Sequence, residues 1–569
     1  MKFLLTLALL LMPGLLLHAR QVEVTTASQI NSGSWSPGDT LVLKNGNWTN
    51  QVISLRAFGT QQNPIVLMAE TPGEVVMNGS SRVSISGQYI EVSGLYFKQG
   101  NVGSSAVFEF RTSSSNLAEN CRMTNCAIVD YNPTLNTTDS KWVSIYGKKN
   151  KVDHCFFENK NNSGTLLVVW LTSSITPEHI VEFNHFGYRI PNLDSNGKEL
   201  NGQEIIRIGD SSTSMQYANV VVRNNFFENC NGEIEIISNK SCGNLYSNNV
   251  FYACKGTLTL RHGNDCTVEG NYFFGNKVAS TGGVRIIGED HKVYNNYFQD
   301  LTGTNFSAAL CMARGKENSA LHEYFQVKNA QVMFNTFVNC SQSFCINYNS
   351  SVTLPPITSV VAHNHIYNES SSYTNVNVAI KQPELDVTWR NNIMNQGKYN
   401  NFPFTAAEVV IGKNAMMTLT QTSIPIFEPV TGTALTDYTT TEFELVQWDI
   451  RGRERVLQSK LPGASELNST ITRVMPDTNN TGVSFLNKTT SVNTPSFSRI
   501  PVHVSNQRDL IQLKSSQAGK LSVFDALGKM MGRLHMQPGS SYERRYGKGL
   551  FLLCFVSDEG QEFKWKIMI

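Results

Sequence analysis

The chain has 569 residues, which is long for one ordinary domain and predicts two or more. Its net charge is +2 and only 16% of its residues are charged, so the composition excludes a nucleic-acid or membrane-surface binder that acts through a bulk positive field. We therefore expect no nucleic-acid partner. An anionic ligand would have to be held by a local group of basic residues.

The N-terminal residues 1–19 are expected to be a signal peptide. Lys2 supplies a positive start, residues 3–17 form a short apolar stretch, and Ala19 is a suitable cleavage point. The stretch is too short to span a hydrocarbon core of about 30 Å, and no later segment is apolar enough to do so. The sequence therefore predicts an exported protein that is secreted, held at the cell surface or periplasmic, with no membrane span.

A repeat runs through residues 20–467, which we expect to form one domain. A phrase of the form Asn-(Asn)-apolar-Phe recurs about every 22 to 41 residues, which is the range of solenoid repeats. It begins at residues 125, 154, 184, 224, 248, 270, 295, 335, 364 and 391. Segment 22–50, which carries Gly and Trp turns, is expected to start the N-terminal cap that a solenoid needs.

Each repeat also contains short strands in which apolar and polar residues alternate. This period of two places Ile234, Ile236, Leu258, Leu260, Val284 and Ile286 inside and their polar neighbours outside. Helical periodicity is nearly absent, so the pattern predicts an all-β fold, a parallel β-helix, in which the repeated Asn side chains stack as a ladder. A propeller is the rival, but its blades need about 40 residues each, more than the central spacing allows.

The eleven cysteines do not follow a disulfide framework. Cys230, Cys254 and Cys340 occupy the same place in the repeated phrase, and no CxxC metal motif is present. Stacked thiols at one repeat position behave as small buried hydrophobic groups. We expect most of the cysteines to be free thiols.

Charged residues concentrate between residues 201 and 285. Glu233 and Glu235 are two residues apart on an expected strand, so both carboxylates should face outward, about 7 Å apart. We expect Arg285 at the strand position of Glu235 two coils on, and Arg261 just beyond that of Thr259. Since coils stack about 4.8 Å apart, acids and bases should converge on one exposed patch, together with Lys240 and His262. Without the basic residues, two outward-facing carboxylates would indicate only an ordinary solvent-exposed surface.

These residues carry a resemblance to a known family. The segments GEIEIISNKS (232–241) and GTLTLRHGN (256–264) resemble the central motif of polysaccharide lyase family 6, which contains alginate lyases and chondroitinase B. The likeness extends to NGQEIIRIG (201–209) and to the N-terminal coils at 62–101. It implies a right-handed parallel β-helix over residues 20–467, in agreement with the repeat.

The resemblance also implies roles for single residues. Asn201, Glu233 and Glu235 would bind Ca²⁺, since amide and carboxylate oxygens suit this hard cation. Lys240 would be the Brønsted base and Arg261 the Brønsted acid. The sugar chain would be held by His262 and Arg285. Apart from the resemblance, Arg314, Lys316 and Tyr348 are further candidates for substrate contact, because they are expected on later coils near the same face.

The implied function is that of a calcium-dependent lyase that cleaves alginate by β-elimination and leaves unsaturated 4-deoxy uronate ends. A dermatan sulfate lyase of the chondroitinase B type is the first alternative, and a non-catalytic carbohydrate-binding β-helix is the second. A β-helix hydrolase would instead need two or three Asp on adjacent coils as acid and base. In every case the expected partner is a polysaccharide, anionic for either lyase.

The C-terminal part should be separate from the repeat domain. Residues 468–500 are rich in Ser, Thr and Asn and are expected to be a linker. Residues 501–569 have their own strand pattern and predict a small β-sandwich. The segments FDALGKMM (524–531), GKGLF (547–551) and FKWKIMI (563–569) resemble the sorting domain of type nine secretion cargo. Phe524, Ala526 and Phe551 differ from the usual residues of that pattern. This resemblance implies secretion machinery as a partner.

Overall fold

The computed structural model describes most of the chain outside the N-terminal segment. The described residues are 19–194, 197, 199–349, 351–369, 376–382, 386–401, 409–411, 417–420, 424–467, 470–486, 502–507, 510–515, 518–525, 529–537, 541–545, 550–558 and 562–568. Nearly all of the expected signal peptide, residues 1–18, lies outside them. No helix among the described residues is long and apolar enough to cross a membrane.

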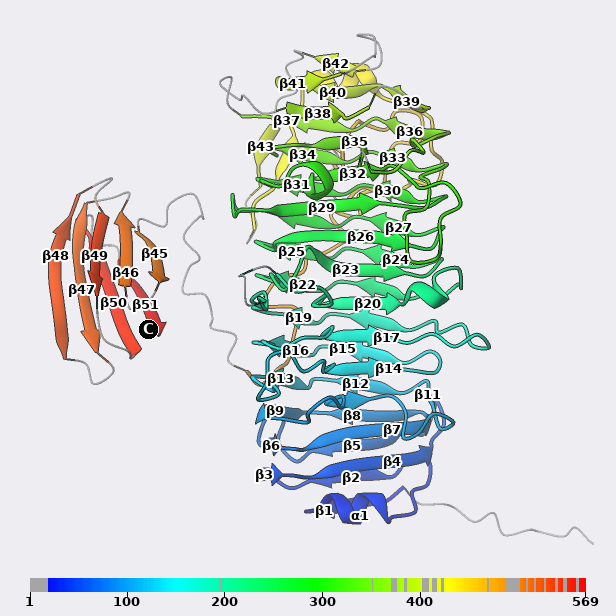
Figure 1. The fold of residues 1–569 in the computed structure, drawn as a ribbon, viewed down its shortest axis with the longest axis vertical. Helices are drawn as coiled ribbons and strands as arrows, with labels where there is room; N and C mark the ends of the chain where they lie inside the picture. The colour runs from blue at the N-terminus through cyan, green and yellow to red at the C-terminus, as the bar shows by residue number, and fades with distance from the viewer. Residues whose placement is uncertain are drawn as a thin grey trace, which may run out of the picture. The chain divides into compact units, whose positions relative to one another are not determined.

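Three parallel sheets, which we name A, B and C, run along one body and form a parallel β-helix (Figure 1). Sheet A contains β1 (Gln21–Val24), β2 (Thr40–Leu43), β5 (Ile65–Ala69), β8 (Ile90–Ser93), β12 (Arg122–Thr124), β15 (Lys151–Asp153), β18 (Ile180–Glu182), β21 (Val221–Arg223), β24 (Leu245–Ser247), β27 (Thr267–Glu269), β30 (Lys292–Tyr294), β33 (Gln331–Met333), β36 (Ser359–Ala362) and β39 (Val387–Arg390). Sheet B contains β3 (Gly46–Thr49), β6 (Val75–Gly79), β9 (Leu95–Gly100), β13 (Ala127–Val129), β16 (Phe156–Glu158), β19 (His185–Phe186), β22 (Phe226–Glu228), β25 (Val250–Tyr252), β28 (Tyr272–Phe274), β31 (Tyr297–Gln299), β34 (Thr336–Val338), β37 (His365–Tyr367), β40 (Asn392–Met394) and β42 (Val409–Ile411).

Sheet C carries the charged segment of the sequence. It contains β4 (Val52–Phe58), β7 (Arg82–Gln88), β10 (Phe108–Glu109), β11 (Ala118–Glu119), β14 (Val143–Ile145), β17 (Leu167–Val169), β20 (Ile206–Gly209), β23 (Glu235–Lys240), β26 (Gly256–His262), β29 (Thr281–Ile286), β32 (Leu310–Ala313), β35 (Phe344–Tyr348), β38 (Val376–Ile380) and β41 (Lys398–Asn400). Helix α1 (Ala27–Asn31) lies at the N-terminal end and packs on β4, within the segment expected to start the cap. Short 3₁₀ turns lie at Ser211–Thr213, Asn305–Ser307 and Ala434–Tyr438.

The predicted asparagine ladder is confirmed. Its members are Asn184, Asn225, Asn249, Asn271, Asn296, Asn335, Asn364 and Asn392, and all are buried. Asn271 is typical: its amide donates to the Asn296 Oδ1 at 3.0 Å and its own Oδ1 accepts from the Asn249 amide at 2.9 Å. A parallel stack of phenylalanine rings, which includes Phe251 and Phe273 with centroids 4.6 Å apart, fills the core beside it. Each coil thus repeats both contacts of the one before it.

Because Asn271 also bonds the backbone of two coils, its replacement by alanine is expected to destabilise the helix. The Asn249 N–H and the Tyr246 and Glu269 carbonyls would lose their side-chain partner inside the body, at a cost of roughly 1–3 kcal/mol for each group left unsatisfied. Thermal unfolding measures the loss. Asn47→Ala, at an exposed strand position, is the matched control and should change little.

The strand pattern differs from the prediction at one place. Ile234 is 39% exposed, although the alternation placed it inside, while Ile236 and Ile237 are both buried. The cause is an irregularity in the pairing of β23 with β26 between Glu235 and Ile237, which shifts the register of the strand. Glu233 consequently lies in the turn before β23, not on the strand.

A strap formed by residues 424–467 and 470–486 returns along the β-helix. It includes β44 (Phe427–Pro429), which pairs with β43 (Met417–Leu419), and it ends where Ser484 N–H donates to Asn125 of an early coil at 2.8 Å. Between these points Arg473 pairs with Glu269. Part of the expected linker, residues 470–486, therefore packs on the β-helix, and residues 487–501 lie outside the described residues.

The chain divides into two compact units, residues 1–487 and 488–569. The second unit consists of two antiparallel sheets. One contains β45 (Val502–Gln507), β46 (Leu510–Ser515) and β49 (Ser541–Arg545), and the other contains β48 (Met530–Met536), β47 (Gly519–Asp525), β50 (Leu550–Ser557) and β51 (Glu562–Met568). This agrees with the small C-terminal β-sandwich that the sequence predicts. Phe524 and Phe551 are strand residues, whereas Ala526 lies outside the described residues.

Ten of the eleven cysteines are buried, and no disulfide joins any of the eleven, all of which lie among the described residues. The Cys254 thiol lies 3.3 Å from the Phe227 carbonyl and 3.4 Å from the Cys230 backbone N–H, so it bonds between coils. Burial raises the pKa of the Cys340 thiol to about 12. The stacked thiols are packing groups, as the sequence indicates.

Candidate active site

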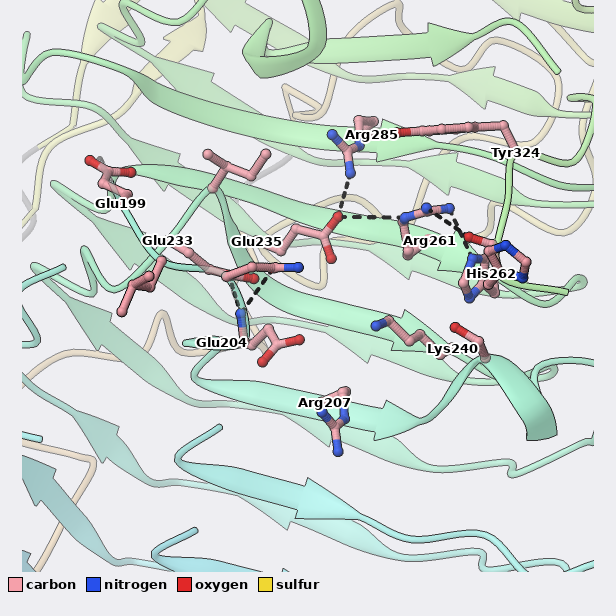
Figure 2. Close-up of a pocket in the computed structure, with 16 residues that line it drawn as sticks. Glu199, Glu204, Arg207, Glu233, Glu235, Lys240, Arg261, His262, Arg285 and Tyr324 are labelled. Atoms are coloured by element: carbon pink, nitrogen blue, oxygen red, sulfur yellow. Dashed lines mark hydrogen bonds and ion pairs between the residues drawn. The ribbon is translucent and has the colours of Figure 1, made fainter. Parts of the chain in front are cut away.

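A cavity of about 790 Å³ opens on sheet C where the charged residues meet. Its lining includes the predicted metal and catalytic residues and two of the predicted substrate residues: Asn201, Glu233, Glu235, Lys240, Arg261, His262 and Arg285. Figure 2 shows Glu204, Glu233 and Glu235 on one side and Lys240, Arg261 and His262 on the other. The Lys240 amine points towards the carboxylates.

The acidic side of the cavity is built by turns that precede two strands. The Glu233 carboxylate accepts hydrogen bonds from the backbone N–H groups of Gly202 at 2.8 Å and Gln203 at 3.3 Å. Burial, and then the neighbouring charges of Glu204 and Glu235, raise the pKa of Glu233 to about 8. Carboxylates that crowd together in this way are stabilised by a bound cation.

These residues fit a calcium ion in the type of their donors. The amide of Asn201, which is exposed, and the carboxylates of Glu233 and Glu235 can each offer an oxygen atom to a cation. Among the described residues no group of three or more His, Cys, Asp and Glu side chains is arranged as a metal site. Since Ca²⁺ takes about six to eight oxygens, water or substrate oxygens would have to complete its coordination.

Glu235 joins the acidic and the basic sides of the cavity. It accepts a hydrogen bond from Ser238 at 2.6 Å and forms an ion pair with Arg285 of β29, while the Arg261 Nε lies 4.0 Å from the same carboxylate. Arg285 pairs in register with Thr259 and so with Ser238, not with Glu235 as the sequence suggested. The two side chains meet because the irregularity in β23 moves Glu235.

Arg261 is held in place by a loop that the sequence analysis did not identify. Its guanidinium donates to the Glu323 carbonyl at 2.7 Å and lies 4.4 Å from the centre of the Tyr324 ring. Figure 2 shows Tyr324 reaching over the cavity from this loop. Burial lowers the pKa of Arg261 from its usual value, with the charge of Arg285 adding to the effect.

His262 is buried beside Arg261, with its Nε2 2.9 Å from the Arg261 Nη1. Burial, and then the charges of Arg261 and Lys240, lower the pKa of His262 to about 3. The imidazole is therefore neutral at neutral pH, and its Nε2 accepts from the guanidinium. A neutral ring fits a role in positioning or hydrogen bonding.

Arg314, Lys316 and Tyr348 do not line the cavity. Arg314 follows β32, and its guanidinium donates to the Thr353 carbonyl. Lys316 pairs with Glu323, the residue whose carbonyl holds Arg261, and so supports the loop.

Besides the loop of Tyr324, the sequence analysis also did not identify Glu204 and Arg207, which line the cavity. Both belong to the NGQEIIRIG segment, whose resemblance to the family was noted for Asn201 alone. Glu204 accepts from Thr165 at 2.7 Å and adds a third carboxylate to the acidic side.

Comparison with known proteins agrees with this fold and site. The alginate lyase AlyGC of polysaccharide lyase family 6 matches with a TM-score of 0.68 and 31% identity over 82% of this chain, and the chain spans only 59% of that protein. A mannuronic acid specific family 6 lyase from human gut microbiota matches with a TM-score of 0.58 and 31% identity, over 66% of this chain and 86% of that one. Pedsa3628 of Pseudopedobacter saltans, a family 6 polysaccharide lyase, matches with a TM-score of 0.57 and 26% identity. The match covers 69% of this chain and 99% of that one. No curated protein sequence matches.

The fold and these matches define the class of protein: the chain has the parallel β-helix fold of the polysaccharide lyases that it matches. Within this class the family model described as chondroitinase B matches residues 24–450. The chain belongs to the chondroitinase B family.

Proposed function

We propose that the protein is a calcium-dependent polysaccharide lyase that cleaves alginate by β-elimination. The observation that carries this proposal is the position of the Lys240 amine, which points towards the clustered carboxylates across the same cavity that Arg261 lines. A hydrolase would need paired acids on both sides of the scissile bond, whereas this cavity has acids on one side and bases on the other. The family membership and the alginate lyases among the matched structures support the reaction class.

In the proposed reaction Lys240 removes the C5 proton of a uronate unit. The C4–O bond then breaks, its electron pair leaves with the oxygen, and a C4=C5 double bond forms. The new end is an unsaturated 4-deoxy uronate, and the leaving oxygen takes up a proton from Arg261, which is then reprotonated from water. Lys240 can accept this proton only as the neutral amine.

Arg261 is placed to act on the leaving oxygen. The carbonyl of Glu323 and the ring of Tyr324 fix the direction of its guanidinium, so little rearrangement is needed when negative charge develops. The lowered pKa of Arg261 is the direction that a proton donor requires. Arg285, paired with Glu235, and the neutral His262 would hold the sugar beside it.

Asn201, Glu233 and Glu235 would hold the calcium ion, with Glu204 close by. A bound Ca²⁺ supplies positive charge that neutralises the uronate carboxylate and so makes the C5 proton more acidic. Without that charge the carboxylate would repel the carbanion-like transition state.

Removal of calcium is expected to abolish activity. Incubation of the purified protein with alginate in EDTA should give almost no rise in ultraviolet absorbance from the unsaturated product, and added Ca²⁺ should restore it. Glu233→Gln should behave like the EDTA-treated protein and bind Ca²⁺ more weakly in calorimetry. Glu228→Gln, at a half-buried strand position outside the cavity, is the matched control. Full activity after chelation would contradict the calcium requirement.

Dermatan sulfate is the second candidate substrate, because the matching family model is that of chondroitinase B. The same absorbance assay with dermatan sulfate distinguishes the two. We expect cleavage of alginate and none of the sulfated polymer.

We also propose that the protein acts outside the cytoplasm, delivered by the N-terminal signal peptide and sorted through the C-terminal sandwich. Deletion of residues 501–569 should leave the enzyme inside the cell envelope, as judged by activity in the medium and on cells.

A further inference from the structure

On the coils that precede Lys240, sheet C carries a row of large side chains. Lys240 pairs in register with Gly209 of β20. Trp170 and Tyr146 directly follow Val169 of β17 and Ile145 of β14, which pair with each other, and Val169 pairs with the residue before Gly209. We name Arg111, Tyr146, Trp170 and Arg207 the arginine–aromatic column.

The four side chains of the arginine–aromatic column contact one another in sequence. The Arg111 guanidinium lies 3.7 Å from the centre of the Tyr146 ring, and the Tyr146 and Trp170 rings are stacked with centroids 6.0 Å apart and planes at 14°. The Arg207 guanidinium lies 5.2 Å from the Trp170 ring. All four are half-buried, so each keeps a part of its surface open to solvent.

Arg207 links the column to the active site. It lines the cavity with Lys240, and Figure 2 shows its guanidinium directed away from Lys240, towards the preceding coils. Arg207 therefore belongs both to the column and to the lining of the cavity.

Arg207 also lacks the partner that comparable arginines have. Arg122 pairs with Asp153 and Arg223 with Glu182, whereas Arg207 forms no ion pair with any described residue. The buried Nε of Arg207 also has no hydrogen-bond partner among the described residues. Since an unpaired, partly buried guanidinium is costly, this group points to an anionic ligand. Arg111, at the other end of the column, forms an ion pair with Glu109 at 2.7 Å.

We propose that the arginine–aromatic column is a row of sugar subsites that extends the substrate groove on the N-terminal side of the reaction centre. This rests on the proposed lyase function. Coils repeat about every 4.8 Å, close to the step of one ring in a 1,4-linked polyuronate, so successive sugars would meet successive coils. The Arg207 guanidinium would bind a sugar carboxylate, with Arg111 beside Glu109 at the other end, and the solvent-exposed edges of the stacked rings would contact the apolar C–H groups of the sugars. The enzyme would consequently favour long chains over short oligosaccharides.

The test compares kcat/KM for alginate polymer with kcat/KM for an alginate tetrasaccharide. Trp170→Ala is expected to lower the polymer-to-tetrasaccharide ratio by about tenfold, and Trp170→Phe, which keeps a ring, should restore most of it. Phe156→Ala removes a half-buried ring of sheet B and is the matched control, with an unchanged ratio. Polymer binding to the Lys240→Ala protein, measured by calorimetry, should weaken to a similar extent when Trp170→Ala is added.

An equal loss on polymer and tetrasaccharide would overturn the subsite proposal, because it would mean that the column only stabilises the stacking of coils. Unchanged polymer binding in the double variant would do the same. Neither result touches the lyase mechanism, which fails separately if Lys240→Ala alone retains activity.

Discussion

Replacement of Lys240 by alanine is expected to lower kcat for alginate by roughly 10²- to 10⁴-fold, the usual contribution of a positioned general base. The amine points towards the carboxylates in Figure 2, and the other lining cations are guanidinium groups, which are too weakly acidic to serve as the base. The remaining binding groups are untouched, so KM should change much less than kcat. Initial rates of ultraviolet absorbance at several alginate concentrations separate the two constants.

The matched control for this variant is Lys292→Ala. Lys292 is a partly exposed lysine of sheet A that pairs with Asp265 and does not line the cavity. Its replacement should leave both constants within twofold of the parent, by analogy with other surface pairs. A Lys240→Ala protein that keeps more than a tenth of the parental kcat would remove Lys240 from the role of base.

Replacement of Arg455 by methionine is expected to produce the largest loss of stability. Arg455 is fully buried where the strap crosses the β-helix, and it donates to Glu466 and to Asn295, each at 2.7 Å. Loss of the guanidinium leaves the Glu466 carboxylate buried without its cation, which costs about 3–5 kcal/mol. Hydrogen exchange of the strap amides and denaturant unfolding both measure the effect.

Arg473→Met is the comparison for this prediction. Arg473 also joins the strap to the β-helix, but its side chain is 27% exposed and its distance to Glu269 is 3.2 Å. Solvent screens such a pair, so the loss should stay within about 1 kcal/mol. Equal effects of the two variants would contradict the assignment of Arg455 as the main anchor.

The repeat could be predicted because residues that contact each other between successive coils of a solenoid recur in the sequence at the length of one coil. Asn249, Asn271 and Asn296 recur at the spacing at which their amides bond, and the strand of Leu258 and Leu260 alternates as a strand should. The charged side chains of the candidate site fall on consecutive coils, so their convergence followed from the same period.

Three features of the structure could not be predicted from the repeat period. The irregularity in β23 exposes Ile234 and changes the partner of Arg285, and nothing in the alternation indicates it. Tyr324 reaches Arg261 from a loop 63 positions further along the chain, where no repeat exists. The strap contacts join residues such as Arg455 and Asn295, which lie 160 positions apart. Such contacts depend on loop conformation and on packing of the whole body.

The mass of the products tests the central claim most directly. Purified protein is incubated with alginate, and the oligosaccharides are analysed by mass spectrometry. Elimination through Lys240 predicts that every new cleavage yields one fragment lighter by a water molecule than the corresponding hydrolysis product, with a C4=C5 double bond at its non-reducing end. Fragments that all carry the added water would contradict a lyase.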